Sequence, residues 1–391
     1  MSKINVIIDF NNILMRSLSV PGTVGCNSNF DSEEDIKDII KKLAVDICYN
    51  IRLFIGADNV YVVCDSHNAW RKDLLPDGSL GYKANRVKDE TRNWDNLWTA
   101  VNEFKDIMRN NGIVVSEIKR AEADDLAALY KYKFFNENNE SIIFISSDKD
   151  WRQLADFKNN NFVIIFNPTV NNKAQKKMFM TQECHDYIFN NSKENAINAL
   201  FAASDNHNKQ VIKNSKNLDA KINIEIVDPN NIVISKIFEG DAGDNVPSYY
   251  DYYKTNKRGT YLAGVTPSQT KKLCEKLNIF NTFDLEGKED DIHVELKNIM
   301  KLDEIPVDPF ERLNRQRILV ELNPEFFPDN IVREFNNLSN TPDKINNNLF
   351  GIKWFTMLTN TKFYSKEDDK PKVNKVFSDL GLIDEIIKPL F

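Results

Sequence analysis

The sequence contains few of the residues that build soft-metal or disulfide sites. Among its 391 residues are four histidines and five cysteines, and neither type shows the CxxC or HxxxH spacing of a zinc site. The cysteine number is odd and Cys64 lies in a strand-like apolar run, which predicts reduced thiols. We therefore expect a cytoplasmic protein, in the host-cell cytoplasm if the chain is viral.

Long apolar runs are also missing. No run approaches the ~18 residues that span a bilayer, and residues 1–10 lack the apolar core of a signal peptide. No internal repeat is evident. These absences disfavour membrane insertion and secretion, and the length predicts two or three domains.

Carboxylates are what the chain has in abundance, and the net charge is −7. Three aspartates each end a short β-branched run: Asp9 after residues 4–8, Asp65 after 60–64 and Asp148 after 141–147. Such runs, spaced by helical stretches, indicate buried parallel strands of an α/β sheet. Ligands bind such sheets at the carboxyl ends of the strands, where these aspartates should converge.

Further acidic residues accompany them. Glu122, Asp124 and Asp125 begin a helical stretch over residues 121–135, and there are two acidic pairs, Asp148 with Asp150 and Asp241 with Asp244. One aspartate at a strand end is ordinarily a turn residue. Carboxylates from five segments would repel one another unless cations neutralised them, and hard oxygen ligands select magnesium or manganese.

A basic and aromatic patch follows Asp65. It contains Trp70, Arg71 and Lys72, then residues 82–88, Arg92 and Trp94. Interleaved basic and aromatic side chains suit a nucleic-acid strand. The alternative is an amphipathic helix whose Trp94 and Trp98 pack on the core.

A second candidate nucleic-acid element surrounds the last acidic pair. Residues 232–238 have helical spacing and stop at Gly240. Further along, Thr266 as N-cap, Pro267 at the first helical position and Gln269 form a capping box. With Lys271 and Lys272 close behind, this helix start is suited to hold a phosphate of duplex DNA.

Taken in order, these motifs resemble the flap endonuclease and 5′ to 3′ exonuclease superfamily, most closely its bacteriophage replication ribonuclease H branch. The resemblance covers about residues 1–170 and 230–335 and rests on residues 8–10, 63–65, 82–86, 122–125, 146–150 and 240–245. It implies an α/β fold with a PIN-like nuclease core, a central mainly parallel sheet, a helix-three-turn-helix element and a helical C-terminal region. The expected domains are the core at 1–180, an Asn/Lys-rich insertion at 181–228, the DNA-binding element at 229–285 and the helical region at 286–391.

The resemblance also implies a set of site residues. Asp9, Asp65 and Asp124 would hold one magnesium ion, and Asp148, Asp150, Asp241 and Asp244 a second. Catalytic roles fall to Lys83 and Arg86 at the scissile phosphate and to Glu122 and Asp125 around the attacking water. Three kinds of nucleic-acid contact are implied. Tyr82 would stack on a terminal base, and Lys83 and Arg86 would contact the strand. The duplex would be bound by Gly264, Thr266, Lys271 and Lys272. Many relatives carry two glycines where this chain has Gly264 and Thr266, which leaves potassium binding at the hairpin turn open.

The implied activity is removal of RNA primers and 5′ flaps during DNA replication by two-metal-ion hydrolysis, with manganese as a substitute for magnesium. The implied partners are DNA and RNA–DNA hybrids. A minority hypothesis is that the apolar terminal segment 381–391 binds a single-strand-binding protein or a sliding clamp. A monomer is expected. Two other functions compete: a PIN-type single-stranded ribonuclease, which would not need the Asp241/Asp244 turn, and a non-catalytic DNA-binding scaffold, which would be expected to have lost acidic positions.

Overall fold

The computed structural model describes residues 3–19, 25–53, 57–75, 81–86, 89–110, 113–168, 177–190, 223–256, 259–302 and 309–339. Within these ranges no helix combines the length and apolar character needed to cross a bilayer. The apolar terminal segment 381–391 lies outside the described residues.

One mixed, mainly parallel sheet forms the centre of the described chain. Its strands are β1 (Ile4–Asp9), β2 (Asn59–Val63), β3 (Val114–Ser116), β4 (Ser141–Ile145), β5 (Asp156–Lys158), β6 (Asn161–Asn167), β7 (Lys177–Met180) and β8 (Asn223–Ile226). The order is β3-β2-β1-β4-β6-β7-β8, with β5 paired to β6. The pairs from β3 to β6 are parallel, and β6 pairs antiparallel with β7. This confirms the predicted α/β class with a mainly parallel sheet.

The central strands are apolar because both of their faces are covered. Along β1, Val6 and Ile8 pack into one core while Ile7 packs into the other, as the alternation of a strand requires. The chain passes from β1 outward to β2 and β3, then crosses to β4 on the other side of β1. The reversal of strand order beside β1 places the carboxyl ends of β1, β2 and β4 around one crevice.

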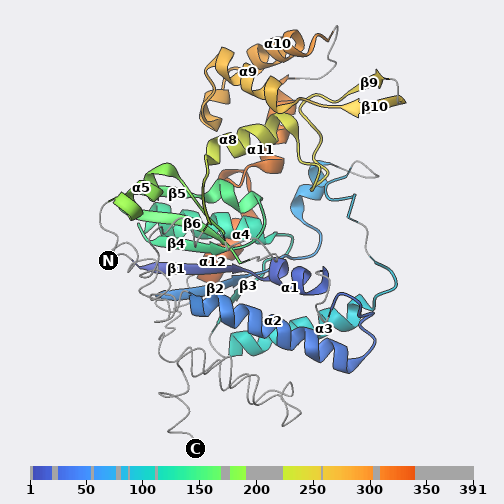
Figure 1. The fold of residues 1–391 in the computed structure, drawn as a ribbon, viewed down its shortest axis with the longest axis vertical. Helices are drawn as coiled ribbons and strands as arrows, with labels where there is room; N and C mark the ends of the chain where they lie inside the picture. Colours follow the sequence, from blue (N-terminus) through green and yellow to red (C-terminus); the bar gives the residue numbers. More distant parts are fainter. Residues whose placement is uncertain are drawn as a thin grey trace, which may run out of the picture.

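Three helices cover one face of the sheet: α1 (Phe10–Ser19), α2 (Glu33–Leu53) and α3 (Trp94–Asn110). In Figure 1, α2 and α3 lie below the strands. Their apolar side chains share a core with those of α5 (Gln182–Asn190). Trp94 and Trp98 pack against this core, as the amphipathic-helix alternative predicted.

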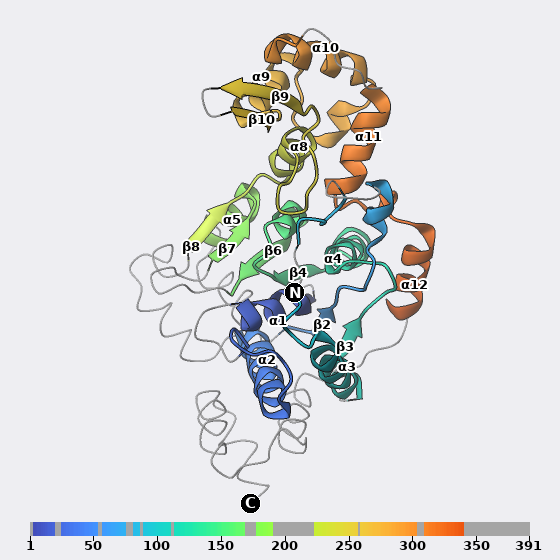
Figure 2. The same cartoon turned by 90° about the vertical axis from the view of Figure 1, so that its right-hand side faces the viewer.

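The other face is covered by α4 (Ala123–Tyr130), which continues as a π-helical stretch over Lys131–Glu137, and by α12 (Asp329–Ser339). Phe335 of α12 meets Tyr130 of α4 edge to face, with ring centroids 4.8 Å apart. Through α12 the distal part of the chain returns to the sheet, beside α4 in Figure 2.

A second, helical unit stands above the sheet in Figure 1. It comprises α8 (Pro229–Glu239), the hairpin β9 (Tyr252–Asn256) and β10 (Gly259–Ala263), α9 (Pro267–Leu277), α10 (Glu289–Met300) and α11 (Pro309–Val320). Short 3-10 turns occur at Trp70–Leu74, Asp150–Leu154, Thr282–Leu285 and Pro324–Phe326. A separate apolar core, which includes Tyr82 from the first part of the chain, holds the unit together.

Both described ends of the expected insertion at 181–228 are ordered parts of the sheet domain. Helix α5 packs into its core, and β8 extends the sheet by pairing in parallel with β7. The residues between them, 191–222, lie outside the described ranges. The domain boundaries themselves stay a prediction.

Replacing Phe335 with alanine should lower the free energy of unfolding by about 3–5 kcal/mol, because it removes a ring that is 2% exposed against α4. Leu338→Ala on the same helix, at a side chain 39% exposed, is the matched control and should cost far less. Urea unfolding curves of the two variants measure this. Equal losses would contradict the docking of α12 on α4.

Candidate active site

Asp9 is the last residue of β1 and is 4% exposed. Its carboxylate accepts hydrogen bonds from the Asn12 amide at 3.0 Å and from Ser146 Oγ at 2.7 Å. Burial, reinforced by the nearby charge of Asp65, raises the pKa of Asp9 to about 7. This carboxyl is therefore a poor anion until a cation comes close to it.

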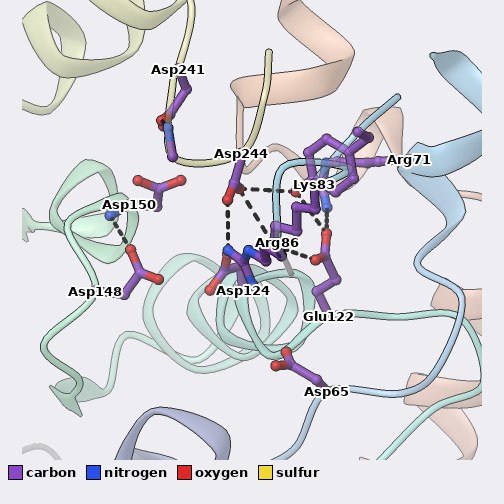
Figure 3. A network of polar contacts seen from close by, with 12 residues as sticks. Asp65, Arg71, Lys83, Arg86, Glu122, Asp124, Asp148, Asp150, Asp241 and Asp244 are labelled. Carbon is purple, nitrogen blue, oxygen red and sulfur yellow. Dashed lines mark hydrogen bonds and ion pairs between the residues drawn. The ribbon is translucent and has the colours of Figure 1, made fainter. Parts of the chain in front are cut away.

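Asp65 and Asp124 lie at the start of α4. Asp65 Oδ1 accepts the Ala123 amide at 2.7 Å, so this carboxylate caps the positive end of the helix. Asp124 accepts the indole N–H of Trp151 at 2.5 Å, and burial together with Asp148 raises its pKa well above the ordinary value. In Figure 3 Asp65 lies apart from the other acidic side chains.

Glu122 and Asp125 are the two ends of the capping box of α4, and a buried guanidinium pairs with both. Arg71, 2% exposed, donates to Asp125 Oδ1 at 2.6 Å and to Glu122 Oε2 at 3.3 Å. Asp125 also accepts the indole N–H of Trp70. Burial would raise the pKa of Glu122, but Lys83 and Arg71 hold it below its ordinary value.

The segment 81–86, here called the basic loop, reaches over these carboxylates. Lys83 has a left-handed backbone, with φ of 56°, and its Nζ lies 2.5 Å from Glu122 Oε1 and 3.4 Å from Asp244 Oδ2. Arg86 donates to Asp244 Oδ1 at 2.7 Å. Figure 3 shows both cations between Glu122 and Asp244.

The segment 241–246, here called the acidic turn, is closed by a pair of backbone hydrogen bonds between Asp241 and Val246. Helix α8 ends just before it at Gly240, whose φ of 78° suits glycine. Lys236 on α8 donates to Asp241 Oδ2 at 2.5 Å and also to Asp150 Oδ1. Burial still raises the pKa of Asp150 to about 6, whereas Lys236 overcomes burial and lowers that of Asp241.

The donor set suits hard divalent cations, because every candidate ligand is a carboxylate and burial, reinforced by neighbouring carboxylates, raises the pKa of Asp9, Asp124 and Asp150. Even so, in the described ranges no three acidic, histidine or cysteine side chains are grouped closely enough to hold an ion. The reason is visible in the contacts: Lys83, Arg86 and Lys236 already occupy the space between the carboxylates.

A small cavity opens where the sheet meets the helical unit. It is lined by residues of both, among them Asp124 and Asp150 from the sheet domain and Lys236, Asp244 and Leu319 from the helical unit. Four of the predicted acidic positions therefore line one opening, although they lie up to 120 residues apart in the chain: Asp124, Asp150, Asp241 and Asp244.

The predicted duplex contacts lie on the helical unit. The capping box of α9 is present, with the Thr266 amide 2.8 Å from Gln269 Oε1, and Lys271 and Lys272 are exposed behind it. Gly264 is needed for packing, because a Cβ there would lie 2.5 Å from that of Ser248. Ser248 Oγ in turn accepts the Val265 amide and donates to the Phe238 carbonyl, which ties α9 to the end of α8.

Three expectations differ from the observed placement. Tyr82 was expected to stack on a base, but its ring is 5% exposed and its hydroxyl shares one proton between Glu122 Oε2 at 3.0 Å and Asp244 Oδ2 at 3.2 Å. Trp70, expected on a nucleic-acid surface, is 7% exposed and packs in the core. Asp125 was expected near the attacking water, yet it is fully buried and faces Arg71. Apolar packing buries the two rings, and hydrogen bonds from Arg71 and the Trp70 indole hold Asp125 inside.

Sequence reasoning missed two cations of this network. Lys236 was not predicted as a site residue, because it lies within a short helical run. Its position one helical turn before the Gly240–Asp244 motif could have indicated that it pairs with an acidic residue there. Arg71 was seen only as part of a basic patch, and its burial depends on contacts with residues about 50 positions away.

Comparison with known proteins gives a family for most of the sheet domain. Residues 6–189 match the family described as "5′-3′ exonuclease, N-terminal resolvase-like domain". A curated 5′-3′ exonuclease of Mycoplasmopsis pulmonis (strain UAB CTIP) is 33% identical over 103 residues, 26% of this chain and 31% of that protein. The chain thus aligns with about a third of that relative. The family match contains the candidate ligands from Asp9 to Asp150 and ends before Asp241.

Two solved structures are similar over most of the chain. A bacteriophage T5 flap endonuclease in a pseudo-enzyme-product complex with DNA and metal ions has 16% identity and a TM-score of 0.47, covering 91% of this chain and 98% of that one. The catalytic core of Rad2 in complex with a DNA substrate has 11% identity and a TM-score of 0.38, covering 91% and 92%.

The raised pKa of Asp9 predicts a pH-dependent instability. The folded carboxyl titrates near pH 7 and the unfolded one near 3.8, so folded stability is lost as pH rises through that window. In chelator at pH 8, Asp9→Asn should be more stable than wild type by up to about 4 kcal/mol, and equal to it near pH 4. Thermal melts at both pH values measure the difference. Asp106→Asn, an exposed aspartate on α3, is the control and should show no such pH effect.

Removing the buried guanidinium of Arg71 should leave two buried carboxylates without this ion-pair partner. Arg71→Met should destabilise the fold by about 3–5 kcal/mol, because Asp125 and Glu122 lose a buried partner. Adding Asp125→Asn should recover part of that loss by removing the buried charge. Denaturant unfolding of the single and double variants tests this, and a further loss in the double variant would contradict the ion-pair assignment.

Proposed function

Because residues 6–189 match the family of 5′-3′ exonuclease N-terminal, resolvase-like domains, we propose that this chain is a metal-dependent 5′ to 3′ exonuclease and flap endonuclease with ribonuclease H activity. It would remove RNA primers and 5′ flaps during DNA replication. The observation that carries the proposal is the meeting of acidic side chains from α4, the 3-10 turn at Asp150 and the acidic turn at one opening, where Lys83 and Arg86 pair with Asp244.

Asp9, Asp65 and Asp124 are the proposed ligands of one magnesium ion, and Asp148, Asp150, Asp241 and Asp244 those of a second, with manganese as a substitute. Bound ions would supply the Lewis acidity that activates water and offsets charge on the phosphate. The hard oxygen donors and the raised pKa of Asp9 and Asp150 support this assignment. Potassium at the Gly264 turn remains an untested expectation.

The chain's own cations have a role that follows from their present partners. Lys83 and Arg86 neutralise Glu122 and Asp244. When those carboxylates are neutralised in another way, both side chains become available to phosphate oxygens at the same opening. There they would stabilise the charge that grows during hydrolysis, so that neither a histidine nor a serine nucleophile is required.

Duplex binding is proposed for the start of α9. Thr266 and the exposed Lys271 and Lys272 present a capped helix N-terminus with positive charge behind it, which suits a backbone phosphate without reading sequence. Ser248 and Gly264 join this surface to the end of α8, next to the acidic turn. The packing of Ser248 and Gly264 would thus set the distance between the duplex-binding start of α9 and the cleavage site.

The remaining expectations stay proposals. They comprise a monomeric protein, a cytoplasmic location, and a single-strand-binding protein or sliding clamp as partner of the terminal segment.

Magnesium-dependent cleavage of a labelled 5′-flap duplex and a matched RNA–DNA hybrid tests the function. Wild type should release short 5′ products that vanish in chelator, and Asp148→Asn should lower the rate by about 10²-fold or more. Asp106→Asn, far from the opening, should cleave normally. Degradation of single-stranded RNA beside intact duplexes would favour the single-stranded ribonuclease, and binding without cleavage would favour the scaffold.

A further inference from the structure

The basic loop and the acidic turn are joined by hydrogen bonds that do not involve their charged groups. The Lys83 amide donates to the Asp244 carbonyl, Asn85 Nδ2 to the Ala242 carbonyl, and Asn245 Nδ2 to the Gly81 carbonyl, each at 2.8 Å. We call these three bonds the clasp. They connect segments about 160 residues apart, one from each part of the fold.

The clasp is reciprocal, because each segment contributes one asparagine amide to a carbonyl of the other. Each segment also contains a residue with a left-handed backbone, Lys83 with φ of 56° and Asn245 with φ of 57°. That conformation is disfavoured for residues with a side chain, so surrounding contacts must hold it. The clasp supplies such contacts at both places.

The geometry of the charged groups depends on this junction. With the two backbones joined, Lys83 Nζ lies 3.4 Å from Asp244 Oδ2, and Arg86 lies 2.7 Å from Asp244 Oδ1. The ion pairs alone do not fix this geometry, because long flexible cations can reach a carboxylate from many backbone positions. Hydrogen bonds between backbone and short amide side chains allow far fewer arrangements.

We propose that Asn85 and Asn245 are positioning residues, which hold the basic loop against the acidic turn so that Lys83 and Arg86 stay aimed at the phosphate-binding opening. This rests on the proposed function. Neither asparagine is among the proposed ligands or phosphate contacts. Both act through the backbone of the opposite segment.

The position of the clasp predicts which kinetic constant changes. The proposed duplex grip at Thr266, Lys271 and Lys272 lies on α9, outside both joined segments. Loosening the clasp should therefore leave KM within about twofold and lower kcat about tenfold, since small misplacements of groups that act on the reacting phosphate reduce the rate of the chemical step.

Two substitutions remove one half of the clasp each. Asn85→Ala deletes an exposed side chain, so the fold should survive it. Asn245→Gly removes the amide but adopts the left-handed backbone readily, which separates the donor from the conformation. Asn278→Gly is the matched control, since Asn278 has a φ of 51° at the end of α9 and takes no part in the clasp.

The hydrogen-exchange rate of the backbone amides in the basic loop measures how firmly the clasp holds, independently of catalysis. In full-length protein, exchange in a peptide spanning 81–86 should be slow in wild type and in Asn278→Gly, and faster in both clasp variants. The double variant Asn85→Ala/Asn245→Gly should lose less kcat than the two single effects combined, because both amides support one junction. Thermal melts should stay close to wild type.

Unchanged exchange in both clasp variants would overturn the inference, as would faster exchange with an unchanged kcat, or equal losses in Asn278→Gly. Failure of the proposed function looks different: wild type itself would not cleave the flap or hybrid. In that case faster exchange in the clasp variants would still establish the junction, and its role in catalysis would be overturned.

Discussion

Mutual repulsion of carboxylates is the constraint on which the rest of this structure depends. The sheet delivers Asp9, Asp65 and Asp148 to one edge because parallel strands end together, and the apolar cores on both faces leave those ends little freedom. Burial then makes each negative charge costly, as the raised pKa of Asp9 and Asp150 shows. The chain therefore has to bring positive charge to the same place.

Four side chains do so, and they come from different directions. Arg71 neutralises the capping box of α4 from within the core, Lys236 reaches in from α8, and Lys83 with Arg86 come from the basic loop. Their partners differ in kind. Arg71 is locked by burial between Trp70 and Phe327, whereas Arg86 is largely exposed and can exchange its partner for another anion. Structural and exchangeable cations thus share one acidic site.

The site is divided between two parts of the fold, so its geometry depends on how these parts are placed relative to each other. The sheet domain contributes the carboxylates up to Asp150, and the helical unit contributes Asp241 and Asp244. Helix α11 supports the second pair: Arg312 donates to the Ser248 and Tyr249 carbonyls, and Gln316 to that of Pro247. Near the opening the clasp joins the two parts directly, and α12 returns the distal chain to α4.

The sequence alone determined what depends on local pattern. The β-branched runs ending at Asp9 and Asp65, the acidic start of α4, the stop at Gly240 and the capping box at Thr266 were all predicted, because each follows from neighbouring residues. Only the tertiary structure decided burial and pairing. Tyr82, Trp70 and Asp125 turned inward, and Lys236, Asn85 and Asn245 found partners across the fold, since those outcomes depend on apolar packing and contacts between segments remote in the chain.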